Sequence, residues 1–218
     1  MEFKDIKWPK SIFVGGIGTG VGKTYATGWL AREMTEVGHS VMTQKLIQTG
    51  CIDESEDIRM HRRIMNIPMH TLDMTKITAP QIYKYPASPH LAAEMEGQEV
   101  RIDLIDAATS VLEEKYSHVL IEGAGGLMTP LKHDYLTIDY VRDHKLPVIL
   151  VTHGGLGSIS ETLMNLYVLA HNKINIFAVV YNPHFDSDKK IAAETRRYLL
   201  NWVENHYPHT LWIEMPKL

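Results

Sequence analysis

Five short runs of almost continuously apolar residues recur along the chain, and longer segments with a different pattern separate them. A run in which apolar residues do not alternate with polar ones is typical of a parallel strand covered on both faces. Helices are therefore expected on both sides of one sheet. The predicted strands span residues 11–14, 41–46, 118–121, 147–152 and 175–181.

The segments between these runs have the periodicity of helices. Within residues 103–116, for example, Ile105, Ala108 and Leu112 fall on one face at helical spacing. Strands and helices in alternation imply right-handed crossovers and a three-layer α/β fold with a mainly parallel sheet. Further helices are predicted over residues 23–37, 54–67, 160–170 and 187–205.

The segment over residues 68–89 is rich in proline and shows little periodicity, so a long ordered loop is expected there. No internal repeat, low-complexity run or linker interrupts the 218 residues, and this length suits one domain with a full core. We therefore predict a single domain over residues 1–218.

Composition excludes several classes of protein. The formal net charge is −4, and the Lys and Arg residues are scattered rather than gathered into the basic stripe of a nucleic-acid-binding protein. The single cysteine, Cys51, excludes an intramolecular disulfide and suits a reducing compartment. Because no segment approaches the ~20 apolar residues that span a bilayer, we expect a soluble, cytoplasmic protein that binds neither nucleic acid nor membrane.

A glycine-rich segment, GGIGTGVGKT over residues 15–24, follows the first predicted strand and opens the first predicted helix. In this context glycines let backbone N–H groups turn toward phosphate oxygens, and the helix N-terminus adds positive potential. Lys23 would reach the β and γ phosphates, and Thr24 would bind magnesium. Five residues separate Gly16 from Gly22 where the strict pattern has four, so the segment is a longer variant of the P-loop. It predicts a P-loop NTPase fold.

Two carboxylates are candidates for completing a magnesium site, since Mg²⁺ prefers hard oxygen ligands. Glu122 follows the third predicted strand and precedes the glycine-rich residues 123–126, at the edge where α/β sheets bind ligands. Asp57 lies near the start of a predicted helix, where an acid also commonly complements the helix dipole. From the residues alone Glu122 is therefore the stronger candidate, and both interpretations of Asp57 stay open.

The order of motifs along the chain resembles the dethiobiotin synthetase family. P-loops are common, but the combination of a Lys-x-x-x-Thr-Gly turn with Glu-Gly-Ala-Gly-Gly at this spacing is specific. The matching segments are the P-loop at 16–24, KLIQTG at 45–50, Asp57, ASPH at 87–90, EGAGG at 122–126, LPVILV at 146–151 and GGLGSI at 154–159.

This resemblance implies ATP-dependent closure of a cyclic urea. Members of the family form a carbamate from 7,8-diaminononanoate and CO₂, phosphorylate it with ATP, and displace phosphate with the second amine to give dethiobiotin. The resemblance also implies Mg²⁺ as cofactor and a homodimer with shared active sites, in which a helix start contacts the substrate tail across the two-fold interface. Such phosphoryl transfer depends on positioning and charge neutralisation rather than on a protein nucleophile.

Carried over by position, the resemblance implies overlapping sets of site residues. The catalytic pair is Lys23 and Lys45, and the magnesium set is Thr24, Asp57 and Glu122. The ATP-binding set is Gly18, Thr19, Gly20, Val21, Gly22, Lys23, Thr24, Tyr25, Glu122, Asn182 and Pro216. The substrate-binding set is Thr19, Lys45, Thr49, Gly125, Gly157, Ser158, Ile159 and Ser160.

The chain departs from the family pattern at three places. Ser160 stands where the family has asparagine, and its hydroxyl can still cap the following helix. Leu46 stands where proline is common, with little expected consequence. Only two residues follow Pro216, where the family usually continues with a tail over the base and ribose. Nucleotide affinity and base selectivity are therefore the properties most open to change.

Two other interpretations compete with this one. A partitioning-type ATPase has a related fold, but its hallmark is an extra lysine early in the loop, where this chain has Gly18. A non-catalytic, regulatory P-loop protein that binds nucleotide without turnover would keep the same loop. Release of ADP only in the presence of diamine and bicarbonate distinguishes the enzyme from both.

Overall fold

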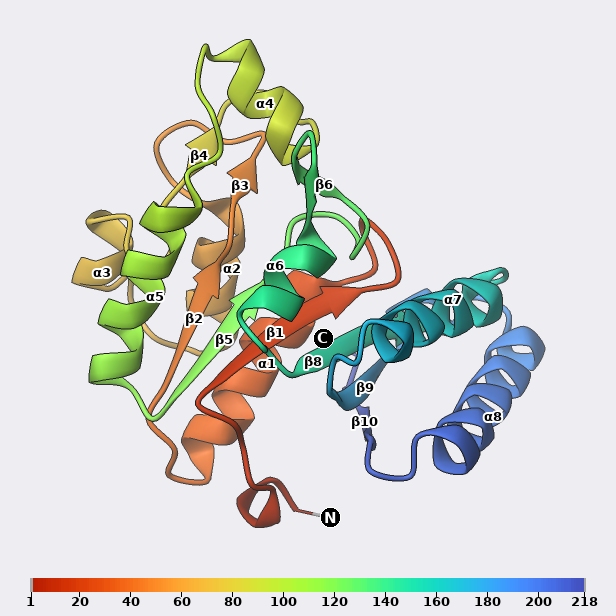
Figure 1. Cartoon of the computed structure of the whole chain (residues 1–218). Coiled ribbons are helices and arrows are strands. Elements are labelled where there is room, and N and C mark those ends of the chain that lie inside the picture. The colour runs from red at the N-terminus through yellow and green to blue at the C-terminus, as the bar shows by residue number, and fades with distance from the viewer. Residues whose placement is uncertain (1, 218) are drawn as a thin grey trace.

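The chain folds around a six-stranded parallel sheet (Figure 1). The computed structural model describes residues 2–217. The strands of the sheet are β1 (Ser11–Gly16), β2 (Val41–Lys45), β5 (His118–Glu122), β8 (Val148–His153), β9 (Ile176–Asn182) and β10 (Leu211–Glu214). They follow the order β10-β9-β8-β1-β5-β2, so β1 lies inside the sheet between β8 and β5. The five predicted strands are confirmed, with ends that move by one or two residues.

Helices cover both faces of this sheet. The chain crosses the sheet in one direction from β1 to β2. It then runs in the other direction from β2 through β5, β8 and β9 to β10. Right-handed crossovers therefore place the helix after β1 on one face and the helices that lead into β5, β8 and β9 on the opposite face. Figure 1 shows α1 and α2 behind the sheet and α5, α6 and α7 in front of it. The three-layer α/β prediction is confirmed. The helices are α1 (Lys23–Glu36), α2 (Glu56–Ile64), α5 (Ile102–Lys115), α6 (Thr137–Asp143), α7 (Ser158–His171) and α8 (Lys189–His206).

Part of the loop predicted over residues 68–89 is regular structure, so that prediction was partly wrong. It contains α3 (Thr71–Met74) and β4 (Ile82–Tyr83), and β4 pairs in parallel with β3 (Gln48–Thr49). Elements of two to four residues are too short to show a hydrophobic period. The other elements without a sequence prediction are η1 (Phe3–Asp5), α4 (Pro89–Met95), β6 (Pro130–Lys132), β7 (Tyr135–Leu136), α6, η2 (Pro183–Phe185) and β10.

The register of the central strands fixes where polar side chains meet. β2 and β5 pair in parallel with Lys45 opposite Glu122, and β1 pairs with β5 so that Val14 is the other neighbour of Glu122. Alternate residues of a strand share a face, so Thr43 lies on the same face of β2 as Lys45. The carboxyl ends of three neighbouring strands therefore gather a lysine, a glutamate and the start of the glycine-rich loop.

Local signals set the ends of the two helices behind the sheet. α1 ends in a Schellman motif, in which Gly38 has φ +96° and the N–H groups of Gly38 and His39 donate to the carbonyls of Thr35 and Met34. α2 begins after Ser55, whose hydroxyl accepts from the Ile58 N–H at 3.1 Å. The cap fixes the first turn of α2, which carries Asp57.

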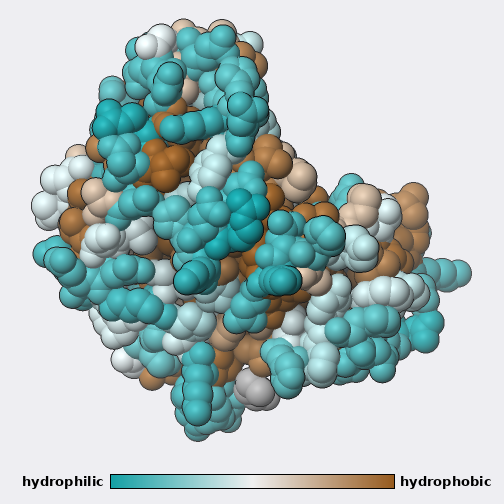
Figure 2. All heavy atoms as spheres, viewed as in Figure 1, coloured by the Kyte–Doolittle hydropathy of each residue, from teal (hydrophilic) through white to brown (hydrophobic). Residues whose placement is uncertain are grey.

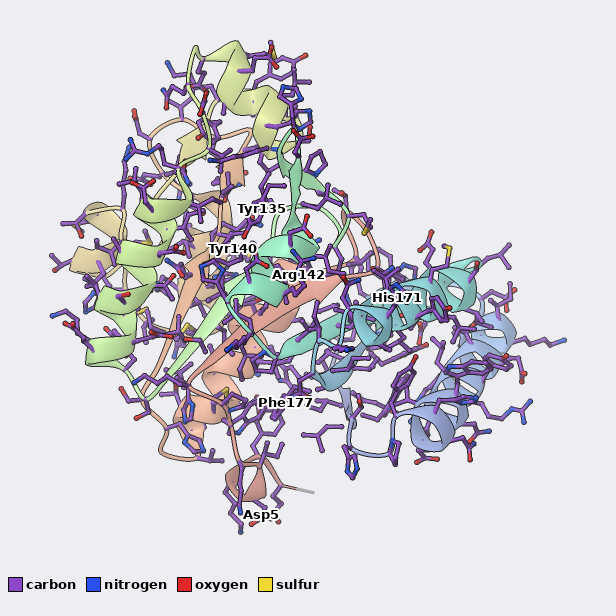
Figure 3. The ribbon with its side chains drawn as sticks, viewed as in Figure 1. Asp5, Tyr135, Tyr140, Arg142, His171 and Phe177 are labelled. Atoms are coloured by element: carbon purple, nitrogen blue, oxygen red, sulfur yellow. The ribbon has the colours of Figure 1, made fainter. Side chains whose placement is uncertain are left out.

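The core lies between the sheet and the helix layers. The predicted inner face of α5 is buried as expected, with Ile105, Ala108 and Leu112 no more than 4% exposed. Figure 3 shows Phe177 of β9 near the N-terminal segment, where the Trp8 ring lies 5.4 Å from the Phe177 ring between centroids. On the face seen in Figure 2, hydrophilic residues cover most of the surface, and hydrophobic ones show in separate patches, one of them at the right where Figure 1 places α7.

A buried ion pair joins α2 to α3. The Arg62 guanidinium donates to both carboxylate oxygens of Asp73, at 2.9 and 2.7 Å, and these side chains are 2% and 1% exposed. Burial alone would raise the pKa of Asp73, but Arg62 and donors from His70 and Thr78 hold that pKa below its ordinary value. The segment over residues 68–89 is thus tied to α2 by charge.

We expect Asp73→Ala to lower the free energy of unfolding by about 3–5 kcal/mol, because it leaves a buried guanidinium without its partner. The pKa of Asp73 is lower in the folded chain, so its contribution is complete above the unfolded value of about 3.9 and declines as the pH falls through the folded value. Urea unfolding at pH 7 and at pH 3 measures both effects. Asp103→Ala, which removes the exposed partner of Arg101, is the matched control and should change stability little. Equal effects of the two substitutions would contradict this prediction.

Candidate active site

The glycine-rich segment forms a turn between β1 and α1, as the P-loop pattern requires. Gly22 lies directly before α1 with φ +91°, and a side chain there would overlap the amide of Asn182. Glycine is therefore required at this position for two independent reasons. The Lys23 ammonium donates to the Gly18 carbonyl at 2.8 Å, and Asn182 at the end of β9 donates to the Val21 carbonyl at 3.1 Å.

Four polar side chains, each from a different element, converge beside this turn. Lys45 Nζ lies 2.6 Å from Asp57 Oδ2 and 2.9 Å from Glu122 Oε1. Thr24 Oγ1 lies 2.8 Å from Asp57 Oδ1 and 3.0 Å from Glu122 Oε1. The structure therefore brings the predicted catalytic lysine and the whole predicted magnesium set to one place. Asp57 lies in the first turn of α2, where it also complements the helix dipole, and its carboxylate faces Thr24 and Lys45.

Two rows of side chains produce this convergence. Thr43 and Lys45 share a face of β2, and Asp57 and His61 are four residues apart on one face of α2. The rows face each other, because Lys45 contacts Asp57 and the His61 ring contacts the Thr43 hydroxyl at 3.1 Å. Glu122 of the next strand contacts both rows, through Lys45 and through His61 Nε2 at 2.7 Å.

The charges in this cluster are strongly coupled. Burial alone would raise the pKa of Glu122, but Lys45 and His61 hold that pKa well below its usual range. Burial opposes the charged form of Lys45, yet the carboxylates of Glu122 and Asp57 outweigh it and raise the Lys45 pKa. Burial and the nearby Lys45 ammonium together lower the pKa of Lys23 to about 8. Lys45 is thus held as a permanent cation, whereas Lys23 is poised to titrate.

The oxygen atoms of this cluster have the chemistry of a magnesium site. A hydroxyl has one hydrogen, so Thr24 can donate to only one of its two carboxylate neighbours and leaves the other oxygen without that bond. Between residues 2 and 217, no three His, Cys, Asp or Glu side chains form a metal site on their own. A divalent cation here would therefore rely on Asp57, Glu122 and Thr24 with oxygens from water and phosphate, which is how Mg²⁺ is usually bound.

Two cavities meet at the glycine-rich turn. One, of about 350 Å³, is lined by Thr19, Lys23, Thr24, Lys45, Thr49, Asp57, Gly125 and their neighbours. The other, of about 310 Å³, is lined by Asn182, His184, Phe185 and Met215. Gly20, Gly22 and Tyr25 line both. An elongated ligand with charged groups at one end and a flat polar ring at the other fits this arrangement.

Comparisons with known proteins agree with this geometry. The AAA domain family matches residues 10–205. The chain is 45% identical over 203 residues to the ATP-dependent dethiobiotin synthetase BioD 2 of Pasteurella multocida, covering 93% of this chain and 95% of that protein. It is also 45% identical over 208 residues to BioD 2 of Haemophilus ducreyi, covering 95% and 99%. The chain belongs to the dethiobiotin synthetase family.

A solved structure was also matched, the signal recognition particle receptor FtsY of Elizabethkingia anophelis. It is 17% identical, with a TM-score of 0.49, and the match covers 94% of this chain and 58% of that one. A likeness of this size carries no functional argument. Identification of the chain as a dethiobiotin synthetase family member confirms the resemblance inferred from its motifs.

Several residues carried over from the family lie outside the two cavities. Glu122 does not line the first cavity but contacts Lys45 and Thr24, which do. The Val21 carbonyl accepts a hydrogen bond from Asn182. Pro216 is exposed, and its buried neighbour Met215 lines the second cavity instead. The remaining predicted residues outside the linings are Gly18, Gly157, Ser158, Ile159 and Ser160.

The start of α7 differs from its prediction. The helix begins at Ser158 rather than Ser160, and the residue before its first turn is Gly157 with φ +94°. No side chain caps this end, so the predicted capping role of Ser160 is wrong. Ser158 donates its hydroxyl hydrogen to the Gly155 carbonyl at 2.7 Å. In a single chain this helix start lies outside both cavities, and its contact with substrate remains a prediction.

Sequence reasoning missed four residues around the site. His61 is fully buried against Glu122, and its only signal was the four-residue spacing from Asp57. His184, Phe185 and Met215 line the second cavity after the ends of β9 and β10, a position without a motif.

Cys51 is buried and unpaired, and burial raises the pKa of its thiol, which disfavours a nucleophilic role.

The lowered pKa of Lys23 predicts that ATP binding takes up a proton in alkaline solution. At pH 9 most of the free chain has a neutral Lys23, and the triphosphate favours the ammonium form. Uptake should approach one proton at pH 9 and decline as the pH is lowered toward 7, where Lys23 is already charged. Calorimetry of ATP binding in buffers of different ionisation enthalpy measures it, and Lys23→Met should lack the alkaline uptake. Uptake that is independent of pH, or that persists in Lys23→Met, would contradict the prediction.

Proposed function

We propose that this chain closes the cyclic urea of dethiobiotin from 7,8-diaminononanoate and CO₂ with ATP, as its family membership implies. The carrying observation is the position of Lys45, between the carboxylates of Asp57 and Glu122 and in the same cavity as Lys23. Two lysines beside one acidic pair suit a reaction in which two anions, a carbamate and a triphosphate, must meet.

The P-loop end of the site would hold the triphosphate. Backbone N–H groups at the start of α1 and the Lys23 ammonium provide positive potential on one side of the first cavity. Asn182, His184 and Phe185 in the second cavity would surround the base. Asn182 already accepts from the His184 N–H at 3.0 Å and donates to Val21, so its amide is held rigidly for this role.

The opposite side of the first cavity would hold the diamine. Lys45, Thr49 and Gly125 line it, and Lys45 remains charged because of its two carboxylate partners. One amine of the substrate adds to CO₂ and loses a proton, which gives a carbamate anion. Its oxygen attacks the γ-phosphorus of ATP and ADP leaves, which forms a carbamic-phosphoric anhydride. The second amine then attacks the carbonyl carbon and loses a proton, and phosphate leaves with the C–O bond electrons as the ring closes.

Each lysine neutralises charge at a different stage. Lys45 would pair with the carbamate while it is the nucleophile, and Lys23 would pair with the γ-phosphoryl oxygens as they are transferred. Thr24, Asp57 and Glu122 would hold Mg²⁺, which would supply positive charge beside the triphosphate. These residues fit such an ion because they offer a hydroxyl and two carboxylates at one point.

A homodimer and a cytoplasmic location belong to this proposal. Leu156 and Met164, before and within α7, are 88% and 57% exposed, and Tyr167 of the same helix is 71% exposed. Large apolar side chains exposed together favour burial against another chain. A two-fold contact there would bring Gly157 to Ser160 of one chain toward the cavity of the other. In the described part of the chain, none of the helices is both long and apolar enough to cross a bilayer.

The proposed activity is tested by incubating the protein with diaminononanoate, bicarbonate, Mg²⁺ and a panel of nucleoside triphosphates. We expect ADP, phosphate and the cyclic urea in equal amounts by mass spectrometry and phosphate assay. Omitting either the diamine or bicarbonate should abolish ADP release. Hydrolysis of ATP at the same rate without the diamine would reject the synthetase in favour of a nucleotide switch.

Lys45→Ala should lower kcat by about 10²–10³-fold, the usual effect of removing one group that stabilises developing charge. ATP affinity should remain within a few-fold of wild type, because Lys23 and the loop amides are unchanged. Steady-state kinetics and ATP calorimetry separate the two quantities, and thermal unfolding checks that the variant is folded. A folded variant with normal kcat would remove Lys45 from the carbamate role. If that variant also binds ATP weakly, Lys45 would be assigned to ATP binding instead.

A further inference from the structure

The carboxylate of Glu122 divides its contacts between its two oxygens. Oε1 lies 3.0 Å from the Thr24 hydroxyl and 2.9 Å from the Lys45 ammonium, on the side of the cavity. Oε2 lies 2.7 Å from His61 Nε2, on the side of α2. The Glu122 and His61 side chains are 1% and 0% exposed, so water has no access to replace the histidine. Rotation of the carboxylate would break contacts on both sides.

The hydrogen bonds behind His61 have a defined direction. Arg62 Nη1 lies 2.7 Å from the Thr43 hydroxyl, and a guanidinium only donates, so Thr43 accepts there. The Thr43 hydroxyl hydrogen is then available for His61 Nδ1 at 3.1 Å. The Glu122 carboxylate has only acceptor oxygens, so its contact with His61 places the ring hydrogen on Nε2, and Nδ1 is then the acceptor for the Thr43 hydroxyl hydrogen. Arg62 is held in turn by its two bonds to Asp73.

We propose that His61 is a positioning residue that holds Oε2 of Glu122, so that Oε1 stays directed toward Thr24 and Lys45 for the reaction. The expected effect of His61 on turnover rests on the proposed function. The hydrogen bond between His61 and Glu122 does not depend on that function. The chain of bonds runs from Asp73 and Arg62 through Thr43 to His61, and it ties the acid of β5 to α3, α2 and β2. Both ring nitrogens are used, so a flip of the imidazole would place carbon atoms against Thr43 and Glu122.

A positioning role for His61 requires its N–H donor, whereas a space-filling role requires only its volume. An apolar side chain of similar size would fill the volume behind Glu122 but donate nothing to Oε2. Partners that orient a metal-binding carboxylate commonly change metal affinity or activity by about 10- to 100-fold when they are removed. His61→Leu therefore removes the donor, and His61→Gln restores an N–H at the place of Nε2.

The first experiment determines the tautomer of His61. Long-range ¹H–¹⁵N spectra of the nucleotide-free protein labelled in histidine should show His61 with its hydrogen on Nε2, and the His61→Gln spectrum assigns the signal. A hydrogen on Nδ1 would overturn the proposed direction of the chain.

The second experiment measures binding of Mn²⁺, which shares the oxygen ligands of Mg²⁺, in the presence of ADP by electron paramagnetic resonance. We expect His61→Leu to weaken Mn²⁺ binding about 10- to 100-fold and His61→Gln to recover most of the loss. In turnover, His61→Leu should raise the Mg²⁺ concentration for half-maximal rate and lower kcat, with less effect on the KM for the diamine. Leu112→Ala, in the fully buried face of α5, is the control for destabilisation and should leave Mn²⁺ affinity unchanged.

Two results would overturn the positioning role. One is a folded His61→Leu protein with wild-type Mn²⁺ affinity and Mg²⁺ dependence, and the other is a His61→Gln protein as impaired as His61→Leu. If the wild-type protein makes no cyclic urea, the proposed function fails, but the tautomer and the Mn²⁺ affinities still decide the role of His61.

Discussion

The buried negative charge of Glu122 is the constraint on which the site depends. A carboxylate that is 1% exposed at the end of an internal strand is tolerated only with charged and hydrogen-bonding partners. Lys45 supplies the charge, and Thr24 and His61 supply the hydrogen bonds. Each partner comes from a different element, so this single carboxylate fixes β2, α1 and α2 relative to β5.

That constraint also separates the roles of the two lysines. Lys45 is bonded to Asp57 and Glu122 and keeps its charge at any pH near neutrality. Lys23 is buried, contacts the Gly18 carbonyl and has a lowered pKa, and within residues 2–217 no carboxylate lies at hydrogen-bond distance from it. One cation is thus neutralised by the protein and the other is available to be neutralised by a ligand. A reaction that joins a weakly charged carbamate to a highly charged triphosphate needs this difference.

The sequence predicted the strands of the sheet well, because the signals that identify them lie within each segment of the chain. Continuous apolar runs identify covered parallel strands, and the turn of β1 into α1 has a glycine pattern that few other structures need. Lys45 could be placed at a strand end but not beside Glu122, because that neighbourhood depends on the register of β2 with β5. Register is a property of paired strands and is invisible in either strand alone.

Other features escaped prediction for different physical reasons. β3 and β4 are two residues long, and their pairing depends on contacts more than 30 positions apart in the chain. A buried histidine without a motif is usually part of the core, so His61 acquires meaning only once Thr43, Arg62 and Glu122 surround it. The second cavity is similar, since His184, Phe185 and Met215 come together only where β9 and β10 end side by side.

The same polar network links stability to chemistry. The ion pair of Arg62 with Asp73 attaches the segment over residues 68–89 to α2, and Arg62 also donates to the hydroxyl that faces His61. A substitution at Asp73 therefore affects the site through the position of Arg62. If the hydrogen-bond chain orients Glu122, loss of Asp73 should disturb metal binding out of proportion to its distance from the cavity. A segment outside the matched motifs then becomes part of what holds the Glu122 carboxylate in place.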